Sequence, residues 1–253
     1  MRLLFSIFIT TLLCSCGQKS NTSKSKNIES DTTATEHVVT STEAKVSPDV
    51  STTQCEYNNP VSDLGIGLVK VPSKLVIYDD PLLTKLYTKR NMEEDYDAMG
   101  FCTKFFKPDY GIMHFVCLGM TNKAYKILIN YSDVKYLPKT KEFEFTTWND
   151  YISSSFGIGR RSVVEGVDYQ PLRTNPEVTS DTLSLPKGNE LFCPMEIKGD
   201  WIKVKYDCFY NNSDNPYEGE PCSQYIDQCK NPLTGWLRWR QKNELLISIY
   251  LMP

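Results

Sequence analysis

The chain has 253 residues, a formal net charge of −3 at pH 7 and nine cysteines. This length has room for one or two small domains. The near-neutral charge balance argues against nucleic acid as a partner, because proteins that bind phosphate backbones usually carry a strong basic excess.

The first sixteen residues have the pattern of a targeting segment. Arg2 supplies a positive start, and residues 3–13 form an apolar run that is too short to span a bilayer. The sequence Leu13-Cys14-Ser15-Cys16 then resembles the lipobox of bacterial lipoproteins. In that family a peptidase cuts before the last cysteine, whose sulfur carries a diacylglycerol. The resemblance implies a signal peptide over residues 1–15 and lipidation of Cys16; an ordinary secretory signal or a short buried helix is the alternative.

The residues after the lipobox bear on the membrane that the protein would occupy. In families with outer-membrane sorting, an aspartate directly after the lipidated cysteine retains the protein in the inner membrane, and here that position is Gly17. No acidic residue follows closely, since the next four residues are Gln-Lys-Ser-Asn. We therefore expect a protein anchored by lipid to the outer membrane and facing the periplasm.

Residues 16–60 are expected to form a disordered tether. From Gly17 to Thr53 the chain is rich in Ser, Thr, Lys, Asn and Glu, with almost no aromatic or large aliphatic residue. Such a segment cannot bury enough apolar surface to offset the entropy lost on ordering. We expect ordered structure from near Val61.

Residues 61–160 are expected to form a first, divergent β unit. Short strands are predicted over residues 67–71, 75–78, 110–118 and 125–130. Residues 82–100 are interpreted as a solvated loop, because their acidic run matches no metal-binding spacing. A short helix is predicted over residues 147–152, with Thr147 as its cap, and residues 160–166 are expected to connect this unit to the next.

The second unit, residues 161–253, carries the clearest pattern. Apolar side chains recur at every second position, which is the strand period; these are Leu191, Cys193, Met195, Ile197 and then Ile202, Val204, Tyr206. Lys198-Gly199-Asp200 between the two runs has turn chemistry. With the later Gly235-Trp236-Leu237, the stretch resembles the bacterial SH3-like domain, a small barrel.

The first unit is similar to the second at a separation of 77 residues. Without a gap, Tyr125, Ile127 and Ile129 align with the second run of alternating residues. After a connection that is shorter than in the second unit, Tyr136-Leu137 takes the place of Trp236-Leu237. A gap of one residue would send each side chain to the opposite face, and His114 is buried in one alignment and exposed in the other. We predict an all-β fold of two small SH3-like barrels in tandem, with a short linking helix.

The second unit contains an insertion, residues 208–231, with three cysteines. Cys208 leaves one strand and Cys229 approaches the next, so a disulfide between them would close the base of the loop in the oxidising periplasm. Apart from the two cysteines of the lipobox, seven remain, and an odd number leaves at least one thiol unpaired. Cys193, on a strand face with Leu191 and Met195, is the best candidate for that thiol.

The sequence offers little that could support catalysis. Of the two histidines, His37 lies in the tether and His114 in a strand. SH3-like relatives often precede a papain-like peptidase domain, for which this chain has no room. We expect a protein that is not an enzyme and that has no cofactor and no metal.

Aromatic and basic residues of the strands are the candidate binding residues. On the strand after Gly235, Leu237 and Trp239 share one face and are expected in the core, while Trp236, Arg238 and Arg240 share the other. With Trp201, and with Tyr136 of the first unit, these three would form the binding surface. The alternative is that Trp236 only caps the barrel.

Two functions are compatible with this pattern. The first is a non-catalytic binding module on a lipid tether, since SH3-like relatives bind cell-wall peptides; its partner would be a peptidoglycan peptide or an envelope protein. The second is a periplasmic immunity or inhibitor lipoprotein that blocks a toxin or a hydrolase.

Overall fold

The computed structural model describes residues 55–95, 99–161, 169–186 and 190–252. Most of the regular structure in these residues is β-strand, as the alternating sequence pattern predicts. Within them there is a single α-helix, α1 (Trp148–Ser153). No helix in the described ranges has the length and apolar character needed to cross a membrane. The signal peptide, Cys16 and most of the expected tether lie outside the described residues.

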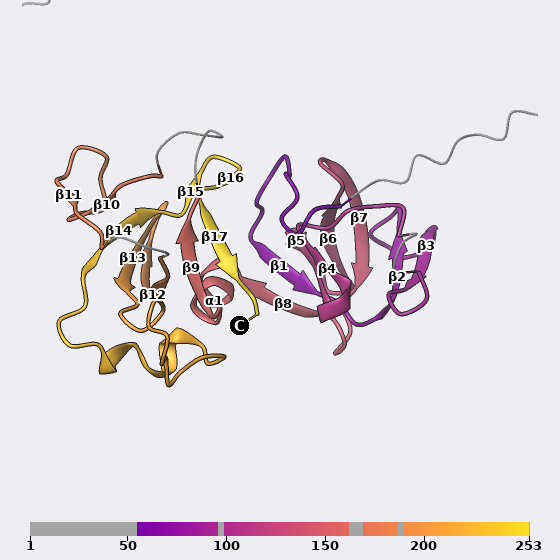
Figure 1. Ribbon diagram of the computed structural model, residues 1–253. Helices are drawn as coiled ribbons and strands as arrows, with labels where there is room; N and C mark the ends of the chain where they lie inside the picture. Colours follow the sequence, from indigo (N-terminus) through magenta and orange to yellow (C-terminus); the bar gives the residue numbers. More distant parts are fainter. Residues whose placement is uncertain (1–54, 96–98, 162–168, 187–189, 253) are drawn as a thin grey trace, which may run out of the picture. The chain divides into compact units, whose positions relative to one another are not determined.

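The first sheet is antiparallel and comes from the first half of the described chain (Figure 1). Its strands follow the order β3-β2-β7-β6-β5-β1-β8, and β4 pairs with β5 outside this path. The strands are β1 (Gly67–Lys70), β2 (Lys74–Tyr78), β3 (Leu86–Asn91), β4 (Phe105–Lys107), β5 (Ile112–Met120), β6 (Ala124–Ile129), β7 (Asp133–Pro138) and β8 (Glu144–Thr147).

The second sheet comes from the C-terminal half and has the order β11-β10-β14-β13-β12-β9-β17. Its strands are β9 (Gly157–Arg160), β10 (Leu172–Arg173), β11 (Thr182–Leu183), β12 (Phe192–Lys198), β13 (Trp201–Tyr206), β14 (Thr234–Arg238) and β17 (Ile247–Tyr250). A separate hairpin pairs β15 (Arg240–Gln241) with β16 (Glu244–Leu245), and short 3-10 turns occur at η1 (Pro108–Tyr110), η2 (Cys222–Gln224) and η3 (Ile226–Gln228).

The two sheets have the same connectivity. When β4 and the β15–β16 hairpin are set aside, the strands of the second sheet occur in the same chain order and pair in the same spatial order as those of the first. The register agrees as well: Cys117 pairs with Ile127, and the residues 77 positions later, Pro194 and Val204, also pair. A bulge follows both pairs at the same place. The ungapped alignment predicted from the sequence is therefore confirmed along these strands.

The agreement continues into the next strand. Tyr136 pairs with Lys126 between β6 and β7, and Trp236 pairs with Lys203 between β13 and β14. Tyr136 thus occupies the position of Trp236, as the sequence predicts. Since a hydrogen-bonded register fixes which face each side chain takes, equivalent residues of the two sheets lie on equivalent faces.

The two sheets bury equivalent alternating side chains, and the first sheet also buries residues that lie between them, such as Leu68, Val116 and Leu128. Val69, Phe115, Ile127 and Leu137 belong to one core cluster of the first sheet. The equivalent side chains of the second sheet belong to another, in the order Ile158, Phe192, Val204 and Leu237. The predicted alternation in β13 is confirmed, because Ile202, Val204 and Tyr206 are buried while the residues between them are half-buried.

The predicted alternation in β12 is wrong. Met195 is 45% exposed, although it was expected on the buried face with Leu191 and Cys193. The bulge between Pro194 and Glu196 gives the strand one extra residue, and the side chain of that residue leaves the core face. Phe192, rather than Cys193, is the β12 side chain that packs in the core of the second sheet.

Helix α1 links the last strand of the first sheet to the first strand of the second. Its predicted cap is confirmed, because the Thr147 hydroxyl accepts a hydrogen bond from the Asp150 N–H at 3.2 Å. Its buried residues Trp148, Tyr151 and Ile152 join the core cluster of the second sheet. The expected boundary at residue 160 would place β9 in the first unit, but β9 pairs with β12 and β17 of the second sheet. The connection expected over residues 160–166 lies mostly outside the described residues.

Two segments expected to lack structure take part in the fold. Residues 82–100 contain strand β3, which pairs with β2 along its length. Residues 55–60 belong to the folded region and not to the tether: Cys55 forms a disulfide with Cys102, and Asn58 makes a β-bridge with Phe105. The Asn59 N–H also donates to the Lys104 carbonyl at 2.9 Å.

Three disulfides join the described cysteines. The predicted bond between Cys208 and Cys229 is one of them. The expectation that Cys193 is the unpaired thiol is wrong, because Cys193 bonds to Cys222. Its side chain points away from the core that holds Phe192, since neighbouring strand residues face opposite sides. The unpaired and buried cysteine is Cys117 in β5.

Candidate binding sites

The aromatic and basic residues predicted on β13 and β14 share one face of the second sheet. Trp201 pairs with Arg238, and Lys203 pairs with Trp236. All four are half-buried, whereas Leu237 and Trp239 are buried at 0% and 3% exposure. The predicted assignment of the two faces is therefore confirmed.

Two of the predicted residues do not join this face. Tyr136 takes the equivalent position in the first sheet, where it pairs with Tyr78 and Lys126. Arg240 lies in the β15–β16 hairpin and forms an ion pair with Asp200 at 2.7 Å. Its guanidinium group lies 4.8 Å from the centre of the Trp239 ring. None of the five predicted residues lines either cavity described below.

A cavity of about 590 Å³ lies against the insertion of the second unit. Its lining combines aromatic rings with polar side chains, and most of it comes from the insertion. The rings are those of Phe156, Tyr210, Tyr217, Tyr225 and Tyr250, and the polar residues include Asn212, Ser213 and Asn215. We call it the tyrosine cavity. Tyr210 and Tyr250 are exposed by 42% and 38%, so both rings are accessible to a ligand.

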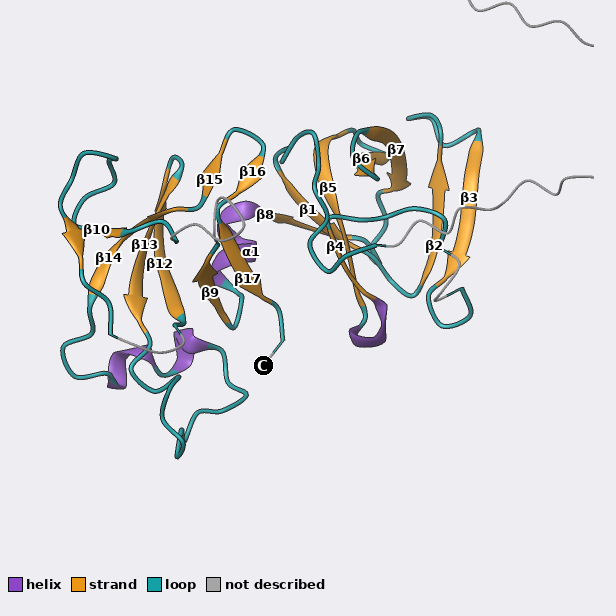
Figure 2. Ribbon diagram, turned by 45° about the horizontal axis from the view of Figure 1, so that its top comes forward, coloured by secondary structure: helices purple, strands orange, loops and turns teal. Residues whose placement is uncertain are grey.

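Two disulfides and a stack of rings hold the insertion in place. The disulfide to Cys193 fixes Cys222, and with it η2, against the outer face of β12, while the bond from Cys208 closes the base of the loop. Figure 2 shows the short helical turns of this insertion in purple. The rings of Tyr217 and Tyr225 stack with centroids 4.7 Å apart and an interplanar angle of 5°.

The wall of the tyrosine cavity is anchored by a buried carboxylate. The Tyr225 hydroxyl donates to Asp207 Oδ2 at 2.7 Å. Burial of the ring, followed by the Asp207 carboxylate, raises the pKa of Tyr225 above its usual value, so the phenol stays protonated. The charged side chains that line the cavity are Glu218 and Glu220. These features suit a neutral or cationic ligand that offers apolar surface and hydrogen-bond donors.

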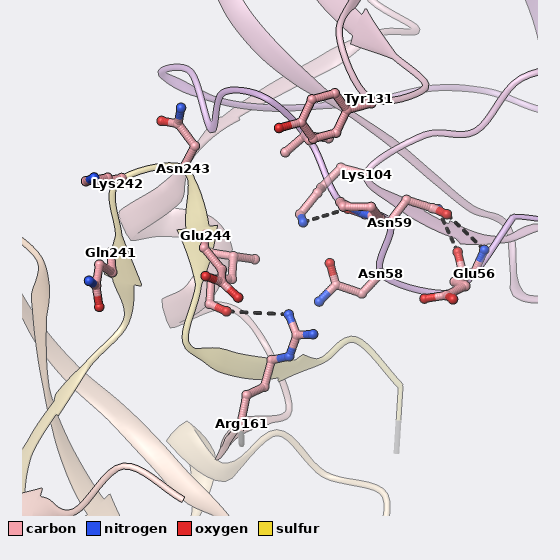
Figure 3. A pocket seen from close by; sticks show the side chains of 13 residues that line it. Glu56, Asn58, Asn59, Lys104, Tyr131, Arg161, Gln241, Lys242, Asn243 and Glu244 are labelled. Carbon is pink, nitrogen blue, oxygen red and sulfur yellow. Dashed lines mark hydrogen bonds between the residues drawn. The ribbon is translucent and has the colours of Figure 1, made fainter. Parts of the chain in front are cut away.

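A second cavity, of about 610 Å³, has a polar lining (Figure 3). We call it the polar cleft. It is lined by the segment 56–61, by Lys104, Tyr131 and Arg161, and by residues 241–245 of the β15–β16 hairpin. Two of the lining cations, Lys104 and Arg161, come from different sheets of the same compact unit.

Lys104 is the most deeply buried charged residue of the polar cleft, at 4% exposure. Its ammonium donates to the Asn59 carbonyl at 2.8 Å. Burial, and then the positive charge of Arg161, lower the pKa of Lys104 from 10.5 to about 8. The Arg161 guanidinium donates to the Leu245 carbonyl at 3.4 Å.

His114 lies in a buried pair and not at either cavity. Its Nδ1 is 2.7 Å from the Tyr151 hydroxyl, and the side chain is 9% exposed. Burial, and then the charge of Lys70, lower the pKa of His114 to about 4. The histidine is therefore neutral at physiological pH and acts as a packed sheet residue. Across the described ranges, no group of three or more His, Cys, Asp or Glu could hold a metal ion.

Neither cavity was predicted from the sequence. Tyr210 and Tyr217 can be recognised in the sequence as aromatic residues in a polar loop. They form a cavity wall because the disulfide between Cys193 and Cys222 holds the loop, whereas the sequence predicts that Cys193 is unpaired. Lys104 could have been noticed in the sequence, because its charge interrupts the stretch between Phe101 and Phe106.

Comparisons with protein-family models, curated proteins and solved structures found no match for this chain.

Proposed function

We propose that the chain is a non-catalytic binding module of the bacterial envelope, and that the tyrosine cavity is its binding site for a cell-wall peptide or an envelope protein. The observation that carries the proposal is this cavity: aromatic walls, accessible rings and two disulfides that hold the walls in place. A wall that is ordered before binding loses little conformational entropy when a ligand arrives.

The finer fold and the cellular location belong to the same proposal. Two SH3-like barrels in tandem are supported by the shared strand order, register and bulge of the two sheets. Lipidation at Cys16 and the outer membrane are supported by the lipobox-like sequence and by Gly17. The three disulfides agree with an oxidising compartment.

One observation favours the second candidate function, an immunity or inhibitor lipoprotein that blocks a toxin or a hydrolase. The insertion carries the exposed ring of Tyr210 and the half-buried rings of Phe209 and Tyr217 on a loop that two disulfides hold. Rigid loops of this kind bind proteins tightly because little ordering remains to be done. In that case the tyrosine cavity would receive a side chain of the target protein.

Co-sedimentation with purified cell wall distinguishes the two functions. The full chain should sediment with the wall, and Tyr217→Ala should weaken binding by about tenfold or more, because it removes one ring of the stacked pair. Tyr110→Ala is the matched control, since Tyr110 is 62% exposed on η1 and does not line the cavity. If the chain stays in the supernatant and instead captures a toxin or a hydrolase through Tyr217, the immunity or inhibitor function is favoured. Unchanged binding by Tyr217→Ala would contradict the proposed site.

A further inference from the structure

The polar cleft holds two cations that form no ion pair with a described acid, although the charge of Glu244 acts favourably on Lys104 from a longer distance. Among the described residues, no carboxylate lies within 4.0 Å of the Lys104 ammonium or the Arg161 guanidinium. Both groups donate to backbone carbonyls, Lys104 to Asn59 and Arg161 to Leu245. An ammonium has three donors and a guanidinium has five. Most of their hydrogen-bonding capacity is therefore open to a ligand.

The charge of Lys104 is only partly compensated within the cleft. Lys104 is 4% exposed; burial and the charge of Arg161 act on its ammonium unfavourably, and the charge of Glu244 offsets part of this. A buried cation is costly unless an opposite charge and hydrogen bonds compensate it. A bound carboxylate would supply both, since charge-assisted hydrogen bonds to two cations are among the stronger polar contacts in proteins.

The cleft also contains a hydrogen-bond acceptor that needs a donor from the ligand. Asn58 Oδ1 is buried and has no hydrogen-bond partner among the described residues. In Figure 3 the side chains of Asn58, Lys104 and Arg161 point toward the same space. A ligand that fits all three carries a carboxylate and, close to it, an N–H group.

The acids of the cleft limit the charge that a ligand can carry. Glu56 and Glu244 line the cleft and are exposed, together with the exposed cation Lys242. Two lining acids disfavour a dianion such as phosphate but tolerate a monoanion, and they would attract an ammonium group of the ligand. The cleft volume of about 610 Å³ suits a small organic molecule.

We propose that the polar cleft binds the carboxylate of an α-amino acid or of the free C-terminus of a short peptide, between Lys104 and Arg161, with the adjacent N–H donating to Asn58. The proposal concerns a site separate from the tyrosine cavity. It does not depend on the lipid anchor or on the function proposed for that cavity.

Calorimetric titration of the full chain tests this site with four probes. Dialanine and free alanine both carry the carboxylate and an adjacent nitrogen donor, and the comparison between them separates a peptide terminus from a free amino acid. Dialanine amide lacks the carboxylate charge, and inorganic phosphate is an oxyanion without the N–H. We expect at least one of the first two to bind, and the amide and phosphate to bind at least tenfold more weakly.

Three variants locate the binding. Arg161→Gln and Lys104→Met should each lower the affinity for the probe that carries the carboxylate by about tenfold or more, since each removes a charge-assisted contact. Lys141→Gln is the matched control, because Lys141 is exposed and does not line the cleft; it should bind as the unaltered chain does. The proposal is overturned if the amide binds as well as dialanine, if Arg161→Gln has no effect, or if neither alanine nor dialanine binds at about 10 mM, a concentration that detects even weak affinities.

Discussion

Lys104 shows at the scale of one residue how a binding site and stability can oppose each other. Its ammonium is buried beside Arg161, and its pKa falls from 10.5 in the unfolded chain to about 8 in the fold. Because the folded pKa is the lower one, folding disfavours the charged form. The buried ammonium therefore does not lower the free energy of unfolding above pH 10.5. Its destabilising effect grows as the pH falls from 10.5 to about 8, and it has its full size below pH 8.

We predict that Lys104→Met stabilises the protein at pH 7. The pKa difference corresponds to about 3 kcal/mol, and leaving the Asn59 carbonyl without its donor costs about 1 kcal/mol of this gain. The free energy of unfolding, measured in urea, should rise by about 1–3 kcal/mol at pH 7, and the gain should shrink as the pH approaches 10.5. Lys141→Met should change little at either pH. A less stable Lys104→Met at pH 7 would show that the buried charge is compensated within the fold.

At the scale of the strand, β14 separates core residues from surface residues. The buried ring of Trp239 packs 5.8 Å from that of Trp148 and donates from Nε1 to the Gly199 carbonyl at 2.9 Å. Trp236 lies on the opposite, half-buried face, across from Lys203. The two tryptophans are three positions apart and have different roles, because side chains alternate along a strand.

We predict that Trp239→Ala costs about 3–5 kcal/mol of stability, since it empties a large buried volume. The midpoint of thermal unfolding should fall by more than about ten degrees. Trp236→Ala should cost clearly less than Trp239→Ala, because its side chain is only half-buried. The measurement is thermal unfolding of both variants by circular dichroism. A larger loss in Trp236→Ala would invert the assignment of the two faces.

The sequence predicts much of the second unit and of the repeat, and it misses elements that depend on distant partners. The run Ile202, Val204, Tyr206 alternates without interruption, so its strand and register follow from local pattern. Strand β3 does not alternate in polarity and is half-exposed, so only its pairing with β2 defines it. The bulge at Met195 adds one residue and shifts the pattern in a way that the alternation itself does not reveal.

The insertion is an element whose shape depends on cross-links. Cys193 and Cys222 are 29 residues apart, and closing such a loop contributes about 3–4 kcal/mol in the chain-entropy model. We predict that the double variant Cys193→Ser with Cys222→Ser becomes sensitive to proteolysis within residues 209–228 and loses ligand binding at the tyrosine cavity. Replacing Cys55 and Cys102 by serine should leave the insertion resistant. Resistance of the first variant at the insertion would mean that its other contacts suffice to hold it.

At the scale of the whole molecule, two sheets of equal connectivity carry different additions. The first sheet has β4, and α1 follows directly after its last strand; the second has the β15–β16 hairpin and the cross-linked insertion. Both cavities are lined in part by these additions, the tyrosine cavity by the insertion and the polar cleft by the β15–β16 hairpin. A repeated scaffold with binding sites on its unshared segments is consistent with the general rule that loops on a rigid framework carry function.

The candidate sites illustrate why function is harder to predict than fold here. The tyrosine cavity joins Phe156, residues of the insertion and Tyr250, which are far apart in the sequence. The polar cleft joins the segment before the first sheet to a hairpin near the C-terminus. Alternation along a strand reports the face that a residue takes, and it carries no information about which distant segments meet. The five predicted residues on the strands remain a hypothesis for a second binding surface.

We propose above that the tyrosine cavity of the second unit binds the ligand of this protein. Hydrogen exchange of the full chain, measured by mass spectrometry with and without solubilised cell-wall peptides, is the decisive experiment for this site. We expect slower exchange in the insertion, residues 208–229, and near Tyr250, and no such change in Tyr217→Ala. Binding that slows exchange only on the outer face of β13 and β14, around Trp201 and Trp236, would contradict it and favour the surface predicted from the sequence.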